Sequence, residues 1–115
     1  MSRRPLIGLL LLAAGPAGAC EIRFIEPQHV EGRGVVEAGL IRGPGCETAT
    51  TIELYLKEQT RGLDRTLARA RRTLRDGRID LVYGCGPPRR MKVYLQVGAP
   101  PSKQTTPVTI IEGCG

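Results

Sequence analysis

The amino-acid sequence predicts an all-β protein: a single small Greek-key or immunoglobulin-like sandwich of about seven strands, stapled by two disulfides. Three observations predict it. Apolar and polar residues alternate with a period of two through most of the chain. Clusters of Gly, Pro and Asp interrupt this alternation at short intervals. Four cysteines are spread along the chain, at Cys20, Cys46, Cys85 and Cys114.

Residues 1–19 predict a removable export signal, which leaves residues 20–115 as one domain. Arg3 and Arg4 precede an apolar run, and residues 17–19 (Ala-Gly-Ala) are typical of a signal cleavage site. The apolar run is about half as long as a bilayer-spanning helix requires. We therefore expect a secreted, extracellular protein. A lipid anchor on Cys20 is the alternative, because residues 17–20 resemble the lipobox of bacterial lipoproteins.

The strands are expected in a regular order. One begins at Ile22, and others cover residues 35–41, 51–57, 67–74, 78–83, 91–97 and 108–111. The third is the clearest, because Ile52, Leu54 and Leu56 alternate with polar neighbours. Turn residues separate the strands at 31–34, 43–45, 76–77 and 86–88, and a Pro-bearing connection covers 99–107.

The segment 63–75 has two interpretations. Leu63, Leu67, Ala70 and Leu74 have helical spacing, which would give an α+β fold with a helix at about 63–75. Asp76-Gly77 follows at once, and Asp-Gly between two alternating runs is a hairpin signal. We favour a hairpin and keep the helix as the alternative.

The even number of cysteines in an exported chain predicts two disulfides, for which three pairings are possible. We favour Cys20–Cys46 and Cys85–Cys114, which close two loops of similar size. Each would stabilise the fold by roughly 3–4 kcal/mol in the chain-entropy model. No C-x-x-C pair is present, which disfavours a zinc ribbon or a redox motif.

The run from Asp64 to Cys85 places Asp76-Gly77 between two alternating segments and ends at a cysteine. With Cys46 and Cys114, this pattern resembles small secreted two-disulfide β-sandwich proteins of actinomycetes and filamentous fungi. The similarity covers most of the mature chain. It implies export, disulfides and β-structure. That group is uncharacterised, so the resemblance implies no activity and no site residues.

Basic residues are concentrated in one part of the chain. The whole sequence has 17 basic and 11 acidic residues, and residues 57–92 hold eleven of the basic and four of the acidic ones. Such a cluster attracts polyanions. The candidate anion-binding residues, most of them on the expected hairpin, are Arg65, Arg69, Arg71, Arg72, Arg75, Arg78, Arg89 and Arg90. An ordinary solvated face is the other interpretation.

Composition disfavours most catalytic sites. The chain has one His, one Phe and no Trp, which excludes a His-rich metal site and a platform for stacking bases. We expect a secreted, monomeric, non-enzymatic binding or effector-type protein without cofactor or metal. Its partner is expected to be an extracellular macromolecule, and the arginines of the expected hairpin favour an anionic one. One alternative is an inhibitor of a secreted hydrolase that presents residues 86–90 or 98–107. A small ribonuclease is the less favoured one, with His29 beside Glu26 or Glu31 and Arg65 or Arg69 binding phosphate.

Overall fold

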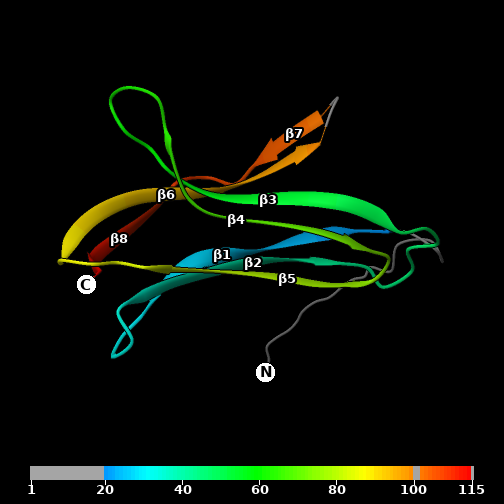
Figure 1. Ribbon diagram of the computed structural model, residues 1–115, viewed down its shortest axis with the longest axis horizontal. Helices are drawn as coiled ribbons and strands as arrows, with labels where there is room; N and C mark the ends of the chain where they lie inside the picture. Colours follow the sequence, from blue (N-terminus) through cyan, green and yellow to red (C-terminus); the bar gives the residue numbers. More distant parts are fainter. Residues whose placement is uncertain (1–19, 100–101, 115) are drawn as a thin grey trace.

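The computed structural model describes residues 20–99 and 102–114, in which eight strands form two antiparallel sheets and no helix (Figure 1). The predicted all-β sandwich is therefore confirmed. The expected export signal at 1–19 and residues 100–101 of the expected connection lie outside the described residues. Within the described part of the chain, no helix could cross a membrane.

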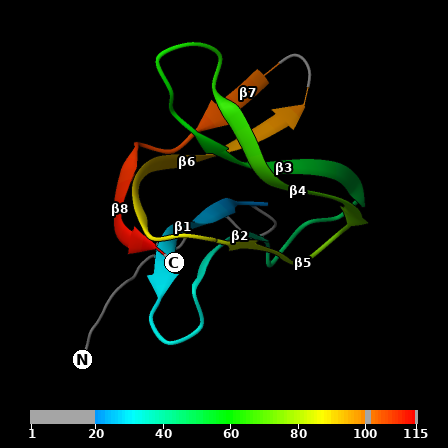
Figure 2. The same cartoon turned by 60° about the vertical axis from the view of Figure 1, so that its left-hand side comes forward.

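The smaller sheet has the strand order β1-β2-β5 and the larger one β4-β3-β6-β7, with β8 also paired to β6. The smaller sheet consists of β1 (Ile22–Val30), β2 (Val35–Arg42) and β5 (Gly77–Gly84). The larger sheet consists of β3 (Thr50–Glu58), β4 (Arg65–Leu74), β6 (Arg89–Ala99), β7 (Ser102–Thr105) and β8 (Thr109–Cys114). The two sheets lie face to face (Figures 1 and 2).

The core lies between the sheets, because alternate residues of each strand point to the same side. Leu40 of β2, Leu54 and Leu56 of β3, and Val93 and Leu95 of β6 are fully buried there. The alternation read from the sequence thus identifies the inward residues of β3, β5 and β6. It also assigns their polar neighbours to the two outer faces.

The segments expected to form a hairpin do not pair with each other. The expected strand at 67–74 is present as β4, so the alternative helix at 63–75 is wrong. However, β4 pairs with β3 in the larger sheet and β5 pairs with β2 in the smaller one. The turn at Arg75-Asp76 therefore carries the chain from one sheet to the other. The expected two-stranded arginine ribbon is wrong for the same reason.

Non-local contacts determine this path of the chain. The Arg42 guanidinium donates hydrogen bonds to the carbonyl oxygens of Thr48, Leu74 and Arg75 at 3.0, 3.0 and 2.7 Å. The Asp76 carboxylate accepts the backbone N–H of Cys46 at 3.0 Å. Together these bonds attach the β4–β5 turn to the β2–β3 connection, so the two segments that cross between the sheets lie side by side.

One further expectation needs correction. The connection expected at 99–107 contains a short strand, β7, which pairs with the end of β6. Pro27 lies within β1, where the pairing with β2 shifts between Ile25 and Gln28. A proline fits there because an edge strand has one side whose N–H groups need no partner.

Both favoured disulfides are present: Cys20–Cys46 and Cys85–Cys114. The first joins the chain ahead of β1 to the β2–β3 connection, and the second joins the end of β5 to the end of β8. The sulfur of Cys20 that a lipid anchor would occupy is bonded to Cys46 in this structure.

Candidate functional site

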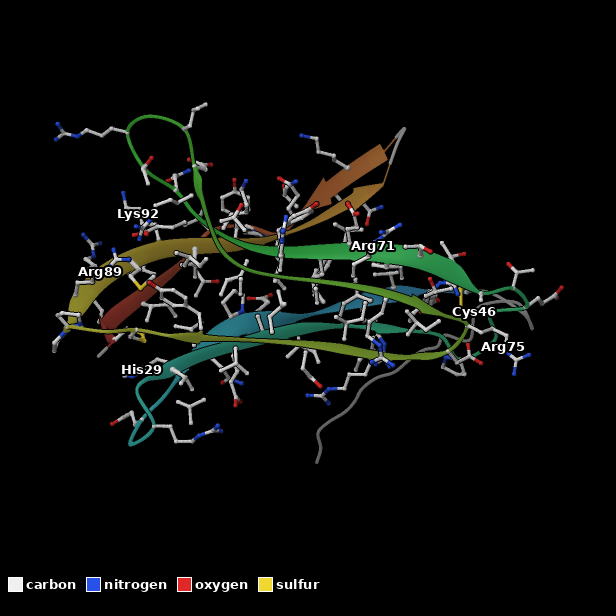
Figure 3. All side chains as sticks on the ribbon, viewed as in Figure 1. His29, Cys46, Arg71, Arg75, Arg89 and Lys92 are labelled. Atoms are coloured by element: carbon white, nitrogen blue, oxygen red, sulfur yellow. A yellow bond between two sulfur atoms is a disulfide. The ribbon has the colours of Figure 1, made fainter. Side chains whose placement is uncertain are left out.

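The outer face of the larger sheet brings together cations from four strands and one loop. Leu54 and Leu56 point inward, so Lys57 of β3 points outward, as do the residues paired beside it on β4 and β6. We call the resulting cluster the basic face. Its members are Lys57, Arg61, Arg69, Arg71, Arg90, Lys92 and Lys103. Figure 3 labels Arg71 and Lys92 on this side of the sheet.

The acidic side chains of this face already have partners. Glu53 accepts a hydrogen bond from the Tyr55 hydroxyl at 2.9 Å and lies 3.5 Å from Arg71. Glu112 lies 3.4 Å from Arg90. Asp64 accepts a hydrogen bond from the Tyr94 hydroxyl of β6 at 2.6 Å. Three carboxylates thus face seven cations, and the basic face keeps a net positive charge.

Five of the seven cations have no ion pair within the described part of the chain. No described carboxylate oxygen lies within 4.0 Å of Lys57, Arg61, Arg69, Lys92 or Lys103. Such groups pair with an external anion without first breaking an internal contact. They therefore form the part of the surface best suited to an anionic partner.

Arg65 and Arg89, two of the expected anion-binding residues, belong to the fold instead. Both contact Glu58, whose side chain is only 9 % exposed at the end of β3. Arg89 binds this carboxylate through two bonds of 2.6 and 3.0 Å, and Arg65 through one of 2.8 Å. Hydrogen bonds from Arg89, and then from Arg65, hold the pKa of Glu58 below its ordinary value although burial opposes this.

Three other predicted arginines also lie off the basic face. Arg72 points toward the interior side of β4 and donates to the carbonyl of Arg78 at 2.7 Å. Arg78 lies on the outer face of the smaller sheet, 2.7 Å from Asp80. Arg75 lies at the turn between the sheets, near Cys46 in Figure 3. Of the eight predicted residues, the structure brings together Arg69, Arg71 and Arg90.

A groove runs along one end of the basic face. It has a volume of about 380 Å³ and is lined by Glu58, Gln59, Thr60, Arg61, Arg90 and Lys92. The backbone N–H of Gln59 donates to the carbonyl of Lys92 at 2.8 Å, which fixes the base of the β3–β4 loop beside β6. Glu58 is already bound by Arg65 and Arg89. The three lining cations therefore dominate the charge of the groove.

The β3–β4 loop, residues 59–64, is the feature that the sequence did not reveal. It rises from the outer side of the larger sheet (Figures 1 and 2) and carries Leu63, which is 95 % exposed. Thr60 closes the loop by donating from its N–H to Asp64 at 3.1 Å and from its hydroxyl to the Leu63 carbonyl at 2.8 Å. The Tyr94 hydroxyl donates to Asp64 at 2.6 Å, so the loop is also attached to β6.

The hydrogen bond between Tyr94 and Asp64 shifts the pKa of both side chains. The Tyr94 hydroxyl lowers the pKa of Asp64, and the Thr60 N–H adds to this effect. Burial, and then the hydrogen bond to Asp64, raises the pKa of Tyr94 to about 12. The loop is thus held by a bond between a carboxylate and a neutral phenol that persists over the ordinary pH range. A polar run containing Gly62 between two strands was the sequence signal that could have identified it.

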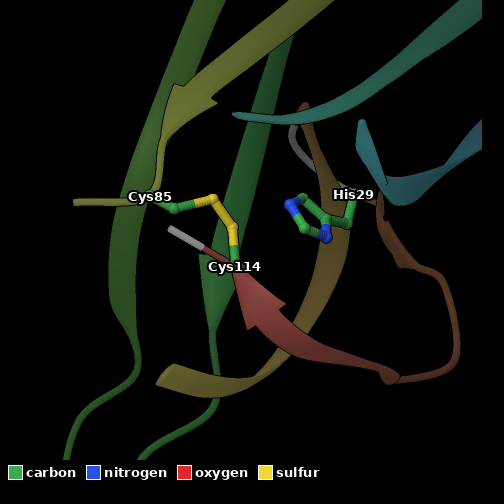
Figure 4. Close-up of side chains that lie close together, drawn as sticks. All are labelled: His29, Cys85 and Cys114. Carbon is green, nitrogen blue, oxygen red and sulfur yellow. A yellow bond between two sulfur atoms is a disulfide. The ribbon is translucent and has the colours of Figure 1, made fainter. Parts of the chain in front are cut away.

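The residues proposed for a ribonuclease are not brought together. His29 lies on β1 in the smaller sheet, with its ring beside the Cys85–Cys114 disulfide (Figure 4). Arg65 is bound to Glu58, and Arg69 lies on the outer face of the other sheet. The ligand atoms of His29, Cys85 and Cys114 lie within 4.8 Å of one another. Because the two sulfurs are bonded to each other, this cluster offers no thiolate to a metal.

The outer face of the smaller sheet differs from the basic face. Ile25, Val30, Val35, Ile41 and Val82 make it largely apolar. Its charges are mostly matched within the face: Arg33 lies 2.9 Å from Glu37, and Arg78 lies 2.7 Å from Asp80. This side therefore has less surplus charge to offer an anion.

Comparison with known proteins gives no match to a family model and none to a curated protein.

Proposed function

We propose that this protein is an exported, monomeric, non-enzymatic binding protein that contacts an anionic partner through its basic face. The observation that carries the proposal is the group of five cations on that face that have no ion pair among the described residues. Several cations on one surface raise the local concentration of anions and speed their association. The two disulfides are compatible with action outside the cell.

Export itself, and membership of the group of small secreted proteins of actinomycetes and filamentous fungi, form part of this proposal. The export signal at 1–19 and the cysteine spacing support both. The intact mass of the exported protein, before and after reduction, tests the export and the two disulfides. We expect a chain that begins at Cys20 and accepts four alkyl groups only after reduction. A mass that includes a diacylglycerol would overturn the secreted form.

Retention on immobilised heparin tests the proposed binding surface. We expect the wild-type protein to be retained at low salt and released as salt rises, because added ions screen the attraction. Replacing Lys57, Arg69 and Lys92 with Glu should weaken binding at least about tenfold, since each cation near an anionic surface contributes about 1 kcal/mol.

A matched control separates the position of the charges from the net charge. Replacing Arg23, Arg33 and Arg78 with Glu changes the net charge by the same amount but alters the smaller-sheet side. This control should keep most of the retention. Equal losses in the two triple variants would mean that net charge alone drives binding, and the basic face would then have no special role.

A further inference from the structure

We propose that the partner is an anionic membrane surface, and that Leu63 at the tip of the β3–β4 loop inserts into it. This inference rests on the proposed function, because it names the partner of the same basic face. The inference starts from the exposed side chain of Leu63, which a soluble polyanion would not bind. A leucine that is 95 % exposed on a braced loop has no contact to make with a sulfated or phosphorylated polymer.

Some of the exposed apolar residues lie beside the cations of the larger sheet. Five large apolar side chains are more than about a third exposed among the described residues: Ile22, Leu63, Val82, Val108 and Ile110. Ile110 pairs with Lys92 across β8 and β6, which places it beside the basic groove. Val108 directly precedes β8. Leu63 and Ile110 therefore accompany the cations of the larger sheet.

The arrangement of charge and apolar surface matches an anionic bilayer. Arg61 is two residues from Leu63 in the same loop, and Arg90 and Lys92 line the groove at its base. A membrane interface accepts apolar side chains about 5–10 Å deep while cations remain at the headgroups. Charge complementarity would bring the loop to the surface, and Leu63 would then add an apolar contribution that salt does not screen.

The β3–β4 loop is held in one conformation by hydrogen bonds before it binds. Thr60 and Asp64 close it from within, and Tyr94 attaches it to β6. Because the loop is already ordered, less conformational entropy is lost when it binds. A loop of this kind keeps Leu63 exposed and prevents it from folding back onto the sheet.

The absence of tryptophan from the sequence makes a direct test possible. In the variant Leu63→Trp, the single indole reports the polarity around the loop tip. We expect its fluorescence to shift to the blue when vesicles of phosphatidylglycerol and phosphatidylcholine are added, and to stay unchanged with phosphatidylcholine alone. The control Val82→Trp, on the outer face of the smaller sheet, should show no shift with either. No shift in Leu63→Trp with the anionic vesicles would overturn the proposal.

Sedimentation with the same vesicles gives a second readout in the otherwise unmodified chain. We expect Leu63→Ala to bind phosphatidylglycerol vesicles about five- to tenfold more weakly than wild type, with heparin retention unchanged. Equal vesicle binding by both proteins would mean adsorption by charge alone and would overturn the insertion of Leu63. If heparin retention persists without vesicle binding, only the membrane proposal fails. If the triple Lys57, Arg69 and Lys92 variant binds heparin like wild type, the proposed basic face fails as well.

Discussion

The outer sides of the two sheets both carry arginines, but in different surroundings. Arg23, Arg33 and Arg78 lie on the smaller-sheet side, where two of them pair with carboxylates of that side. Arg69, Arg71 and Arg90 lie on the larger sheet, where they, Arg61 and three lysines together outnumber three carboxylates. The difference teaches that the balance of charges on each face, rather than the number of arginines, distinguishes the two surfaces.

A third group of arginines lies on neither face and supports the fold. Arg65 and Arg89 surround the buried Glu58, and Arg42 binds carbonyl oxygens across the junction of the sheets. A candidate binding surface should exclude them.

Removing the buried carboxylate should cost far more stability than removing an exposed one. Glu58→Ala leaves Arg65 and Arg89 without their counter-charge, so we expect a loss of about 3–5 kcal/mol in the free energy of unfolding. Glu37→Ala removes the partner of Arg33, which is exposed, and should cost about 0–1 kcal/mol. Urea denaturation measures both. Similar losses in the two variants would contradict the division between structural and surface arginines.

The stability of the wild-type protein should also depend on pH through Glu58. Its pKa is lower in the folded state than its ordinary value of 4.5, so the ionised form stabilises the fold. This contribution is complete above the unfolded-state pKa and is lost as the pH falls through the lower folded-state pKa. We expect Glu58→Gln to show a shallower decline of unfolding free energy below about pH 4.5 than wild type. Parallel acid limbs for the two proteins would count against this role.

Arg42 should contribute more to the free energy of unfolding than Arg78, although both are arginines of the smaller sheet. Arg42 donates to three carbonyl oxygens and to the Thr50 hydroxyl, whereas Arg78 pairs with an exposed Asp80. We expect Arg42→Ala to lower the unfolding free energy by about 1–3 kcal/mol and Arg78→Ala by less than about 1 kcal/mol. If Arg78→Ala costs as much, the bonds of Arg42 do not secure the junction.

The smallest expected effect concerns the attachment of the β3–β4 loop. Asp64→Ala removes the carboxylate that accepts the Tyr94 hydroxyl, so the pKa of Tyr94 should fall from about 12 toward its ordinary value of 10.0. The fall should be partial, because burial is the larger cause of the raised pKa. Near-UV absorbance of the phenolate follows this titration. An unchanged pKa would mean that the loop is not held against β6 in solution.

Sequence reasoning predicted the fold class well because strand alternation and cysteine parity are local or countable properties. Ile52, Leu54 and Leu56 identify an inward face without knowledge of the partner strand. The two disulfides followed from the even number of cysteines and from the similar size of the two loops that the favoured pairing closes. The pairing of the strands could not be predicted in this way. Turn residues such as Asp76-Gly77 show where the chain turns, but they do not show which strand the next segment pairs with.

The candidate site was predicted less well for a related reason. Arg65, Arg72 and Arg89 look like Arg69 in the sequence. However, the buried Glu58 binds Arg65 and Arg89, and Arg72 lies on the inward side of β4 and donates to the Arg78 carbonyl. Lys57 and Lys92 join the basic face only because β3 and β6 are neighbours in the sheet. Leu63 was read as part of a helical pattern, and its exposure depends on hydrogen bonds that sequence spacing does not reveal.

The crossed order of the strands has a consequence for folding kinetics. Neither sheet is continuous in the sequence. Strands β3 and β4 are inserted between β2 and its partner β5, and β5 in turn separates β4 from β6 of the larger sheet. The smaller sheet can therefore close only after the intervening segment has been brought into place, and loop-closure entropy opposes that step. Sandwiches dominated by such distant pairings refold in about milliseconds to seconds, far more slowly than small helical bundles. We expect the two sheets to form in one cooperative step, so that no fragment ending after β4 retains the native smaller sheet.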